Sequence, residues 1–197
     1  MGYSLSLIAV QCADPAQALS HLGIVRTGLF CEYAREPMSG CVLPDNWFLI
    51  VARRCDRPFL KPKVLGPLSD QSPVVACSIE EHTMFSSAEY WADGKMIWRA
   101  EHVGEDGPIH LKTSGVLPPD FETMAAAHKA QQEADGGEKA GVDHYFGCNS
   151  HTDDTRWAFM GTTFSGKETS RRYSAETSFH APSKRSLWAR ARKVRMA

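Results

Sequence analysis

The sequence predicts an α+β fold, in which an antiparallel β-meander sheet packs against a few helices within a single domain with a basic C-terminal tail. Four strand-like segments follow one another within residues 74–116. The length of 197 residues suits one domain, and the hydrophobic fraction of 43% is that of an ordinary globular chain with a substantial core. We expect residues 1–164 to form the globular α+β domain and residues 165–197 to form a flexible basic tail.

The N-terminal elements follow from local patterns. Apolar and small polar residues alternate from Tyr3 to Val10, which is typical of a strand with one buried face. Asp14 then places a capping carboxylate directly before Pro15. A short helix is therefore expected, which Gly23 ends.

The next stretch predicts a hairpin and a loop. Residues 24–33 and 47–54 are rich in β-branched and aromatic side chains, with turn-forming residues between them, so they could pair as a hairpin. Residues 56–73 contain four prolines and little periodicity. This composition favours a loop, with at most one helical turn around residues 60–65.

The meander is the clearest pattern in the chain. Its four segments read VVACSIEE, TMFSSAEYW, KMIWRAEHV and IHLKTSGV. Asp93 and Gly94 form the kind of two-residue turn that suits a tight hairpin. That turn would bring Trp91 and Trp98 near each other across the strands.

Two helices are expected after the meander. The segment Phe121–Ala134 follows Pro118-Pro119-Asp120 and is made of good helix formers, with a few apolar residues available for packing. The segment Thr155–Met160 could form a short helix that Gly161 ends.

Charge divides the chain into two opposite parts. From Lys167 onward there are nine Lys or Arg residues against two acidic ones, and the preceding part holds thirteen basic and twenty-one acidic residues. The formal charges are therefore +7 and −8. Such a split favours contact between one part and a charged partner, or between the tail and the body itself.

The expected compartment is the cytoplasm. The N-terminal apolar stretch has no preceding Lys or Arg and is short, so neither a signal peptide nor a membrane span is expected. The six cysteines contain no C-x-x-C pair and read as reduced thiols. We expect no membrane partner.

No standard catalytic motif is present in the sequence. It contains no G-x-S-x-G elbow, no phosphate-binding P-loop, no dinucleotide glycine fingerprint and no H-E-x-x-H pair. We therefore expect a protein without enzymatic activity, without catalytic residues and without a cofactor, although catalytic groups can also converge from distant parts of a chain.

One group of residues could hold a metal ion, although we favour a structural interpretation. Imidazole and carboxylate ligands stand close together at Asp143, His144, His151, Asp153 and Asp154, with Cys148 among them. The alternative is that Asp153 and Asp154 cap the following helix and that no metal binds. A small metal-dependent hydrolase using His144, His151 and Asp153 is the second functional hypothesis.

Acidic and imidazole side chains also lie along the meander, at Glu80, Glu81, His82, Glu89, Glu101 and His102. Neighbouring strands could bring two carboxylates and an imidazole together for acid–base chemistry. We favour the interpretation that these residues form the solvated face of the sheet.

The aromatic residues allow more than one interpretation of their role. Trp91 and Trp98, with Tyr90, could form an exposed recognition platform, but burial in the core is favoured because tryptophan has a large apolar surface. The basic stretch 167–195 contains Tyr173, Phe179 and Trp188 and could bind nucleic acid, which is the third hypothesis.

Four consecutive stretches within about residues 75–160 form a distinctive pattern: YWADGKMIWRAEHVGEDGPIHL, SGVLPPDF, the helix ending in QQEADGG, and VDHYFG. In these stretches the chain resembles a group of small bacterial cytosolic proteins of the immunity type, which neutralise toxins. The resemblance implies a protein that binds and occludes a partner, and it assigns no role to any residue.

The leading hypothesis is thus a protein-binding module, a bacterial immunity-type inhibitor whose acidic body captures a basic toxin or effector. The residues expected to face that partner are acidic or aromatic: Trp91, Asp93, Trp98, Glu101, Glu105, Asp106, Asp143, Asp153 and Asp154.

Overall fold

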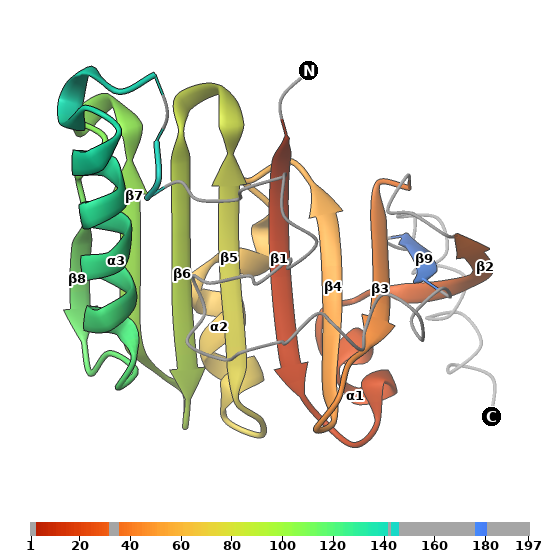
Figure 1. Cartoon of the computed structure of the whole chain (residues 1–197). Coiled ribbons are helices and arrows are strands. Elements are labelled where there is room, and N and C mark those ends of the chain that lie inside the picture. Colours follow the sequence, from red (N-terminus) through yellow and green to blue (C-terminus); the bar gives the residue numbers. More distant parts are fainter. Residues whose placement is uncertain (1–2, 32–35, 142, 146–175, 181–197) are drawn as a thin grey trace, which may run out of the picture.

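The computed structural model describes residues 3–31, 36–141, 143–145 and 176–180 (Figure 1). It confirms the α+β fold class. Within the described ranges, one antiparallel sheet contains nine strands in the order β2-β9-β3-β4-β1-β5-β6-β7-β8. The strands are β1 (Ser4–Gln11), β2 (Val25–Cys31), β3 (Met38–Val42), β4 (Trp47–Arg53), β5 (Val74–Glu80), β6 (Phe85–Ala92), β7 (Lys95–Val103), β8 (Lys112–Gly115) and β9 (Glu176–His180).

The described residues also form three α-helices and four short 3₁₀-helices, which connect these strands. The α-helices are α1 (Pro15–His21), α2 (Pro62–Ser69) and α3 (Phe121–Ala134). The 3₁₀-helices are η1 (Pro58–Leu60), η2 (Glu81–Thr83), η3 (Gly104–Asp106) and η4 (Gly137–Lys139). The predicted helix 155–160 lies outside the described residues.

The meander is confirmed as four consecutive antiparallel strands, β5 to β8. Strand β1 joins it to the other half of the sheet, because β1 pairs with β5 on one side and with β4 on the other. The predicted hairpin between residues 24–33 and 47–54 is wrong. Strand β4 pairs instead with β3, and β2 pairs with β9 from the C-terminal part of the chain. Propensity marks strands but does not choose their partners.

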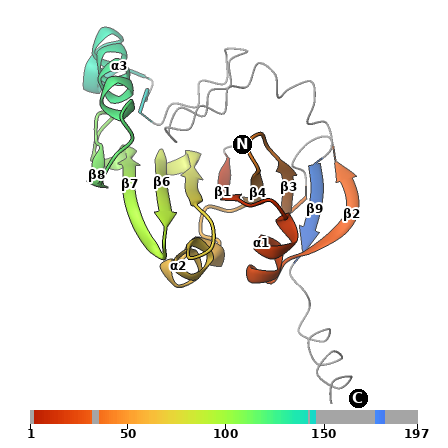
Figure 2. The same cartoon turned by 90° about the horizontal axis from the view of Figure 1, so that it is seen from below.

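The two faces of the sheet carry separate apolar clusters. Helices α1 and α2 cover one face, and α3 lies on the opposite side near β7 and β8 (Figure 2). Beneath α1 and α2, the core includes Ile8, Phe48, Ile50, Leu65 and Trp91. The other face holds Leu7, Ala9, Val75, Ala88 and Trp98. Successive residues of β1, β4, β5 and β6 therefore pack alternately into the two clusters.

Helix α1 is the helix that the sequence predicts. The Asp14 carboxylate accepts a hydrogen bond from the Ala16 amide at 2.9 Å, and Pro15 occupies the first turn. Gly23 follows the helix with a φ of 65°, a conformation that glycine adopts without strain.

Helix α2 corrects the expectation of a loop over residues 56–73. Pro62 stands at the first helical position, where its missing N–H is not needed, so this proline starts the helix. Pro67 lies inside the helix and removes one backbone hydrogen bond. Burial of Leu65 and Leu68 in the core offsets that loss.

The predicted tail contains one described segment, strand β9, which lies between β2 and β3. The remainder of residues 165–197 is outside the described part of the chain, so the division into domain and tail stays a prediction. Among the described helices, none combines the length and the apolar character that crossing a bilayer requires.

Candidate functional site

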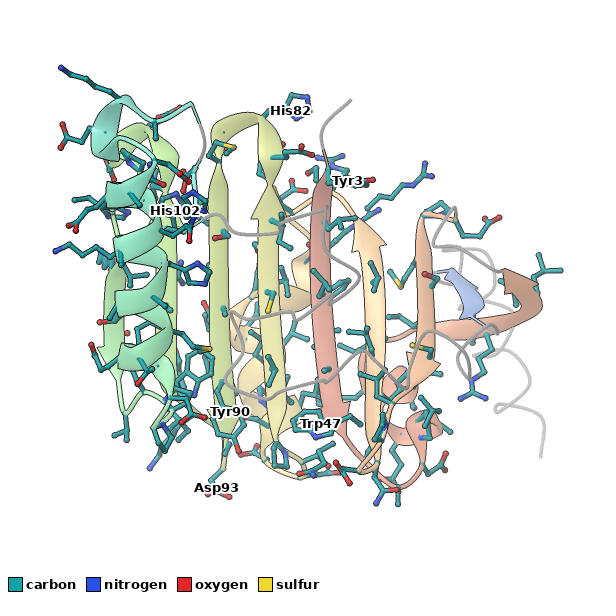
Figure 3. All side chains as sticks on the ribbon, viewed as in Figure 1. Tyr3, Trp47, His82, Tyr90, Asp93 and His102 are labelled. Carbon is teal, nitrogen blue, oxygen red and sulfur yellow. The ribbon has the colours of Figure 1, made fainter. Side chains whose placement is uncertain are left out.

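The site that we consider lies where β5, β7 and α3 end. Figure 3 shows His82 and His102 at this end of the sheet and Asp93 at the opposite end. Helix η2 is adjacent to η3, because Phe85 pairs with Val103 and the Gly104 amide donates to the Met84 carbonyl at 3.0 Å. We call η2, η3, the last turn of α3 and residues 143–145 the His102 end.

A buried imidazole connects three of these segments. The His102 side chain is fully buried, and its Nδ1 atom lies 2.6 Å from the carbonyl oxygen of His110. Its Nε2 atom lies 2.8 Å from a carboxylate oxygen of Asp143, whose side chain is 9% exposed. Because both ring nitrogens face oxygen acceptors, His102 ties the β7–β8 connection and the segment after α3 to the sheet.

Aromatic packing surrounds this pair. The Tyr145 ring stacks on His102 with centroids 6.1 Å apart and planes inclined by 15°. The Tyr145 hydroxyl donates to the Ala125 carbonyl of α3 at 3.1 Å, and the Asp143 carboxylate accepts from the Tyr145 amide. Burial raises the pKa of the Tyr145 phenol, and the charge of Glu133 raises it further.

Hydrogen bonds of a buried side chain also hold the last turn of α3. The buried Gln132 side chain donates to the Gly137 carbonyl at 2.8 Å and accepts from the His144 amide at 2.9 Å. The His144 ring lies 2.6 Å from a carboxylate oxygen of Asp135. These bonds fix η4 and residues 143–145 against the helix.

The pKa of His128 in α3 is shifted by the same surroundings. Its ring packs against Tyr145, with centroids 6.2 Å apart. Burial lowers the pKa of His128, and the proximity of His144 lowers it further. The neutral imidazole is thus favoured at this position in α3.

A serine hydroxyl beside His102 raises the question of a catalytic triad. Ser86 pairs with His102 across β6 and β7, and its buried Oγ has no hydrogen-bond partner among the described residues. A Ser-His-Asp triad needs one imidazole nitrogen facing the nucleophile and the other facing the acid. In this protein Asp143 and the His110 carbonyl face the two nitrogens of His102. His102 is therefore not placed to activate Ser86.

The structure bears on the metal hypothesis for part of its residues. Within the described ranges, no group of three or more His, Cys, Asp or Glu side chains could hold a metal ion. His144 instead pairs with Asp135, and Asp143 contacts His102. His151, Asp153, Asp154 and Cys148 lie outside the described residues.

The meander group does not share one solvated face, which corrects that expectation. Glu89 and Glu101 lie on the face that α2 covers, where Arg99 contacts both carboxylates. Glu89 also accepts from the Trp91 indole at 2.8 Å. His102 points to the opposite face and is buried. Adjacent strand residues alternate between faces, which separates Glu101 from His102.

The two tryptophans lie on opposite faces of the sheet. Trp91 is 7% exposed in the core under α2, and Trp98 is 5% exposed in the other cluster. Trp98 pairs with Tyr90, and the two rings stack with centroids 6.3 Å apart. The prediction that both tryptophans lie in the core is therefore confirmed. The exposed platform, with both tryptophans as surface anchors, is not what the structure shows.

The predicted partner-facing acids are divided among several places. Glu105 and Asp106 are exposed in η3 at the His102 end, whereas Asp93 is exposed at the opposite end of the β6–β7 hairpin. Glu101 is paired with Arg99, and Asp143 is largely buried against His102. Asp153 and Asp154 are not in the described part of the chain. The structure thus keeps Glu105 and Asp106 together and separates the others from them.

Sequence reasoning missed two acids that join Glu105 and Asp106. Asp135 and Glu138 are exposed just after α3. A chain of contacts connects them to η3. On the η3 side, Asp106 lies 3.7 Å from His110, whose carbonyl oxygen contacts the His102 ring. His102 also contacts Asp143, and the next residue in the chain, His144, contacts Asp135. We call Glu105, Asp106, Asp135 and Glu138 the acidic rim. Its two pairs are thirty positions apart, and no local pattern links them.

A cleft on the other side of the molecule is the alternative site. A cavity of about 450 Å³ opens between α1 and α2. Val10, Ala18 and Leu68 are among its apolar lining residues, and Gln17, His21 and Gln71 are among its polar ones. Cys12 also lines it. Burial raises the pKa of the Cys12 thiol and the Asp14 carboxylate raises it further, so the unreactive thiol form is favoured.

Comparisons with protein-family models, with curated proteins and with solved structures find no significant match.

Proposed function

We propose that this protein is a binding protein that captures a basic protein partner through the acidic rim. In its most specific form, the proposal is an immunity-type inhibitor that occludes a toxin or effector in the cytoplasm. The observation that carries it is the junction at the His102 end. Two distant segments, which carry four exposed carboxylates, are joined by a buried network centred on His102 and Asp143.

A rigid acidic surface suits recognition of a basic protein. Complementary charges accelerate the encounter of two proteins and exclude partners of the same sign. Preorganised side chains lose less conformational entropy when the complex forms. The buried contacts of His102, Gln132 and Tyr145 provide such preorganisation, because they fix the backbone that carries the rim.

Two further observations support the proposal. The part of the chain before Lys167 carries a formal charge of −8, counted from the sequence. The resemblance to immunity-type proteins covers the meander, α3 and residues 143–145, which are the segments that build the rim.

Affinity capture with matched variants tests this function. The bait is the full chain, and the prey is an extract of the source cells in which the products of neighbouring genes are expressed. The rim variant combines Glu105→Gln, Asp106→Asn and Glu138→Gln. The control variant combines Asp93→Asn, Asp120→Asn and Glu122→Gln, and it removes the same formal charge from exposed positions elsewhere.

We expect the wild type and the control variant to capture the same basic protein. The rim variant should bind it at least about tenfold more weakly, and the affinity should fall with added salt. Equal affinity of all three proteins for the captured partner would overturn the rim as the binding surface. Recovery of no protein partner by the wild type would overturn the function itself.

A further inference from the structure

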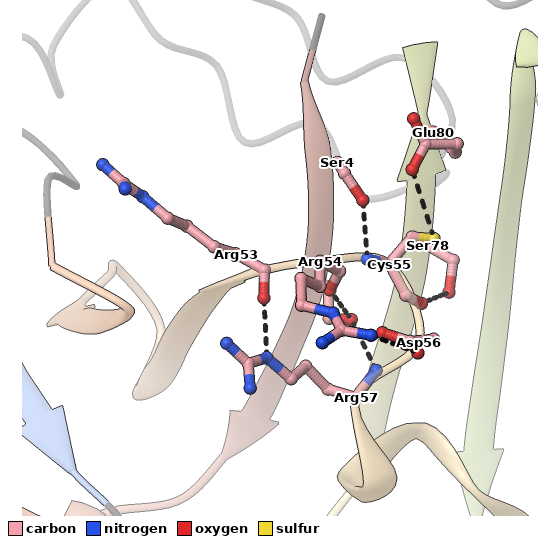
Figure 4. A network of polar contacts seen from close by, with 9 residues as sticks. Ser4, Arg53, Arg54, Cys55, Asp56, Arg57, Ser78 and Glu80 are labelled. Atoms are coloured by element: carbon pink, nitrogen blue, oxygen red, sulfur yellow. Dashed lines mark hydrogen bonds and ion pairs between the residues drawn. The ribbon is translucent and has the colours of Figure 1, made fainter. Parts of the chain in front are cut away.

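The loop after β4 is attached to the sheet by serine hydroxyls (Figure 4). The Arg54 amide donates to the Ser4 carbonyl at 2.6 Å, and the Cys55 amide donates to the Ser4 hydroxyl at 3.0 Å. From the other side, the Ser78 hydroxyl donates to the Cys55 carbonyl at 2.9 Å. Buried Ser6 donates to the Arg54 carbonyl at 2.6 Å. The backbone of residues 54–57 is thereby immobilised against β1 and β5.

This loop concentrates positive charge. Arg53, Arg54 and Arg57 are followed by Lys61 and Lys63 at the start of α2, and Asp56 is the acidic residue within the same stretch. Asp56 lies 3.1 Å from the guanidinium of Arg54 and so neutralises that arginine. The nearby Glu80 carboxylate accepts from Ser4, His82 and Cys55. Arg53 and Arg57 keep their charge without a carboxylate partner among the described residues.

The Arg57 guanidinium is held in one orientation. Its Nε donates to the Arg53 carbonyl at 2.6 Å, and its backbone amide donates to the Ser6 hydroxyl at 3.2 Å. The two terminal nitrogens make no hydrogen bond to the described residues, and the side chain is half-buried. An arginine normally loses much rotamer freedom when it binds a ligand, and this anchoring has already removed part of that freedom.

The geometry points to an oxyanion site at Arg57, in which its two terminal nitrogens bind two oxygens of a phosphate group and Arg53 adds long-range attraction. A guanidinium can bind phosphate through two parallel hydrogen bonds, a bidentate arrangement that a lysine ammonium cannot make. Lys61 and Lys63 raise the local anion concentration. This site shares no residue with the acidic rim and does not depend on the proposed protein partner.

Side-chain NMR of the full chain tests the site directly. The probe is inorganic phosphate, titrated at constant ionic strength with chloride as the replaced anion. The Arg57 Nε–H resonance should shift and saturate, with a dissociation constant in the millimolar range. The Nε–H resonance of Arg26 in β2, whose guanidinium lies over the Phe48 ring of β4, is the internal reference and should not saturate.

Two charge-preserving variants complete the experiment. Arg57→Lys should weaken phosphate binding at least about fivefold, because the two-pronged contact is lost. Arg26→Lys should leave the affinity unchanged. An acetate titration distinguishes a phosphate site from a general anion site, and phosphate should bind more tightly. The proposal is overturned if the Arg57 resonance responds linearly like that of Arg26, if Arg57→Lys binds phosphate as well as the wild type, or if acetate binds equally.

Discussion

The Nε2 atom of His102 lies 2.8 Å from a carboxylate oxygen of Asp143, although the two residues are 41 positions apart in the chain. Their side chains are 0% and 9% exposed. This contact joins the end of β7 to the segment that follows α3. It is therefore the contact on which the shape of the acidic rim depends.

Breaking this buried pair should destabilise the protein. We expect His102→Ala or Asp143→Ala alone to lower the free energy of unfolding by about 3 kcal/mol, because the remaining group loses its partner while it stays buried. The double variant should lose less than the sum. Urea unfolding measures this. The control is His82→Ala, since its side chain is 68% exposed and its contact with Glu80 should contribute less than about 1 kcal/mol. Unchanged urea midpoints for both single variants would contradict the role of the pair.

Glu80 should make stability depend on pH in the acidic range. Hydrogen bonds from Ser4, His82 and Cys55 lower the pKa of Glu80 to about 2, against roughly 4.3 in an unfolded chain. Because the folded-state pKa is the lower one, the stabilisation is present above pH ~4.3 and is lost as the pH falls towards 2. Glu80→Gln should flatten the pH dependence of the urea midpoint between these values. A slope identical to that of the wild type would show that Glu80 does not contribute.

Cys12 should respond to the charge of Asp14. Burial and then this carboxylate raise the pKa of the thiol. Asp14→Asn and Asp14→Ser both keep a side chain that can cap α1, but they remove the charge. Alkylation of Cys12 by iodoacetamide, followed by mass spectrometry of its peptide, should therefore be half-maximal at lower pH in both variants. Cys55, beyond the opposite end of β1, serves as the internal control and should react at unchanged pH. An unshifted Cys12 profile would exclude the proposed influence of Asp14.

Substitution of two glycines by alanine should distinguish the energetic cost of a strained backbone from that of a steric clash. Gly115 in β8 has a φ of 82°, and an added Cβ would lie 2.0 Å from the Ile97 carbonyl oxygen. Gly28 in β2 has a φ of 79° and nothing within 4 Å of an added Cβ. Gly28→Ala should thus cost about 1 kcal/mol for the left-handed conformation alone. Gly115→Ala should cost a further 1–3 kcal/mol, roughly, for the overlap with the β7 backbone. Equal unfolding free energies for the two variants would contradict this assignment.

The sequence by itself determined the elements whose signals are local. The alternation from Tyr3 to Val10, the Asp14-Pro15 cap of α1, the Asp93-Gly94 turn and the run of helix formers in α3 are local signals, so these elements were predictable. The expectation that β1 buries only one face was wrong, because Leu7, Ile8, Ala9 and Val10 are all buried. The proline content of residues 56–73 led to the wrong prediction of a loop where α2 lies. Pro62 starts that helix, and the burial of Leu65 outweighs the interruption by Pro67.

The tertiary structure alone decided how these elements meet. Strand β2 pairs with β9 because strand pairing is chosen by long-range packing, which propensity does not encode. The positions of Trp91 and Trp98 on opposite faces follow from the register of β6 against β7. The two halves of the acidic rim are joined through the contact between His102 and Asp143, and Ser6 holds the backbone amide of Arg57. The β2–β9 pairing, the contact of His102 with Asp143 and the contact of Ser6 with Arg57 each join residues far apart in the chain, and they exist only once the sheet has assembled.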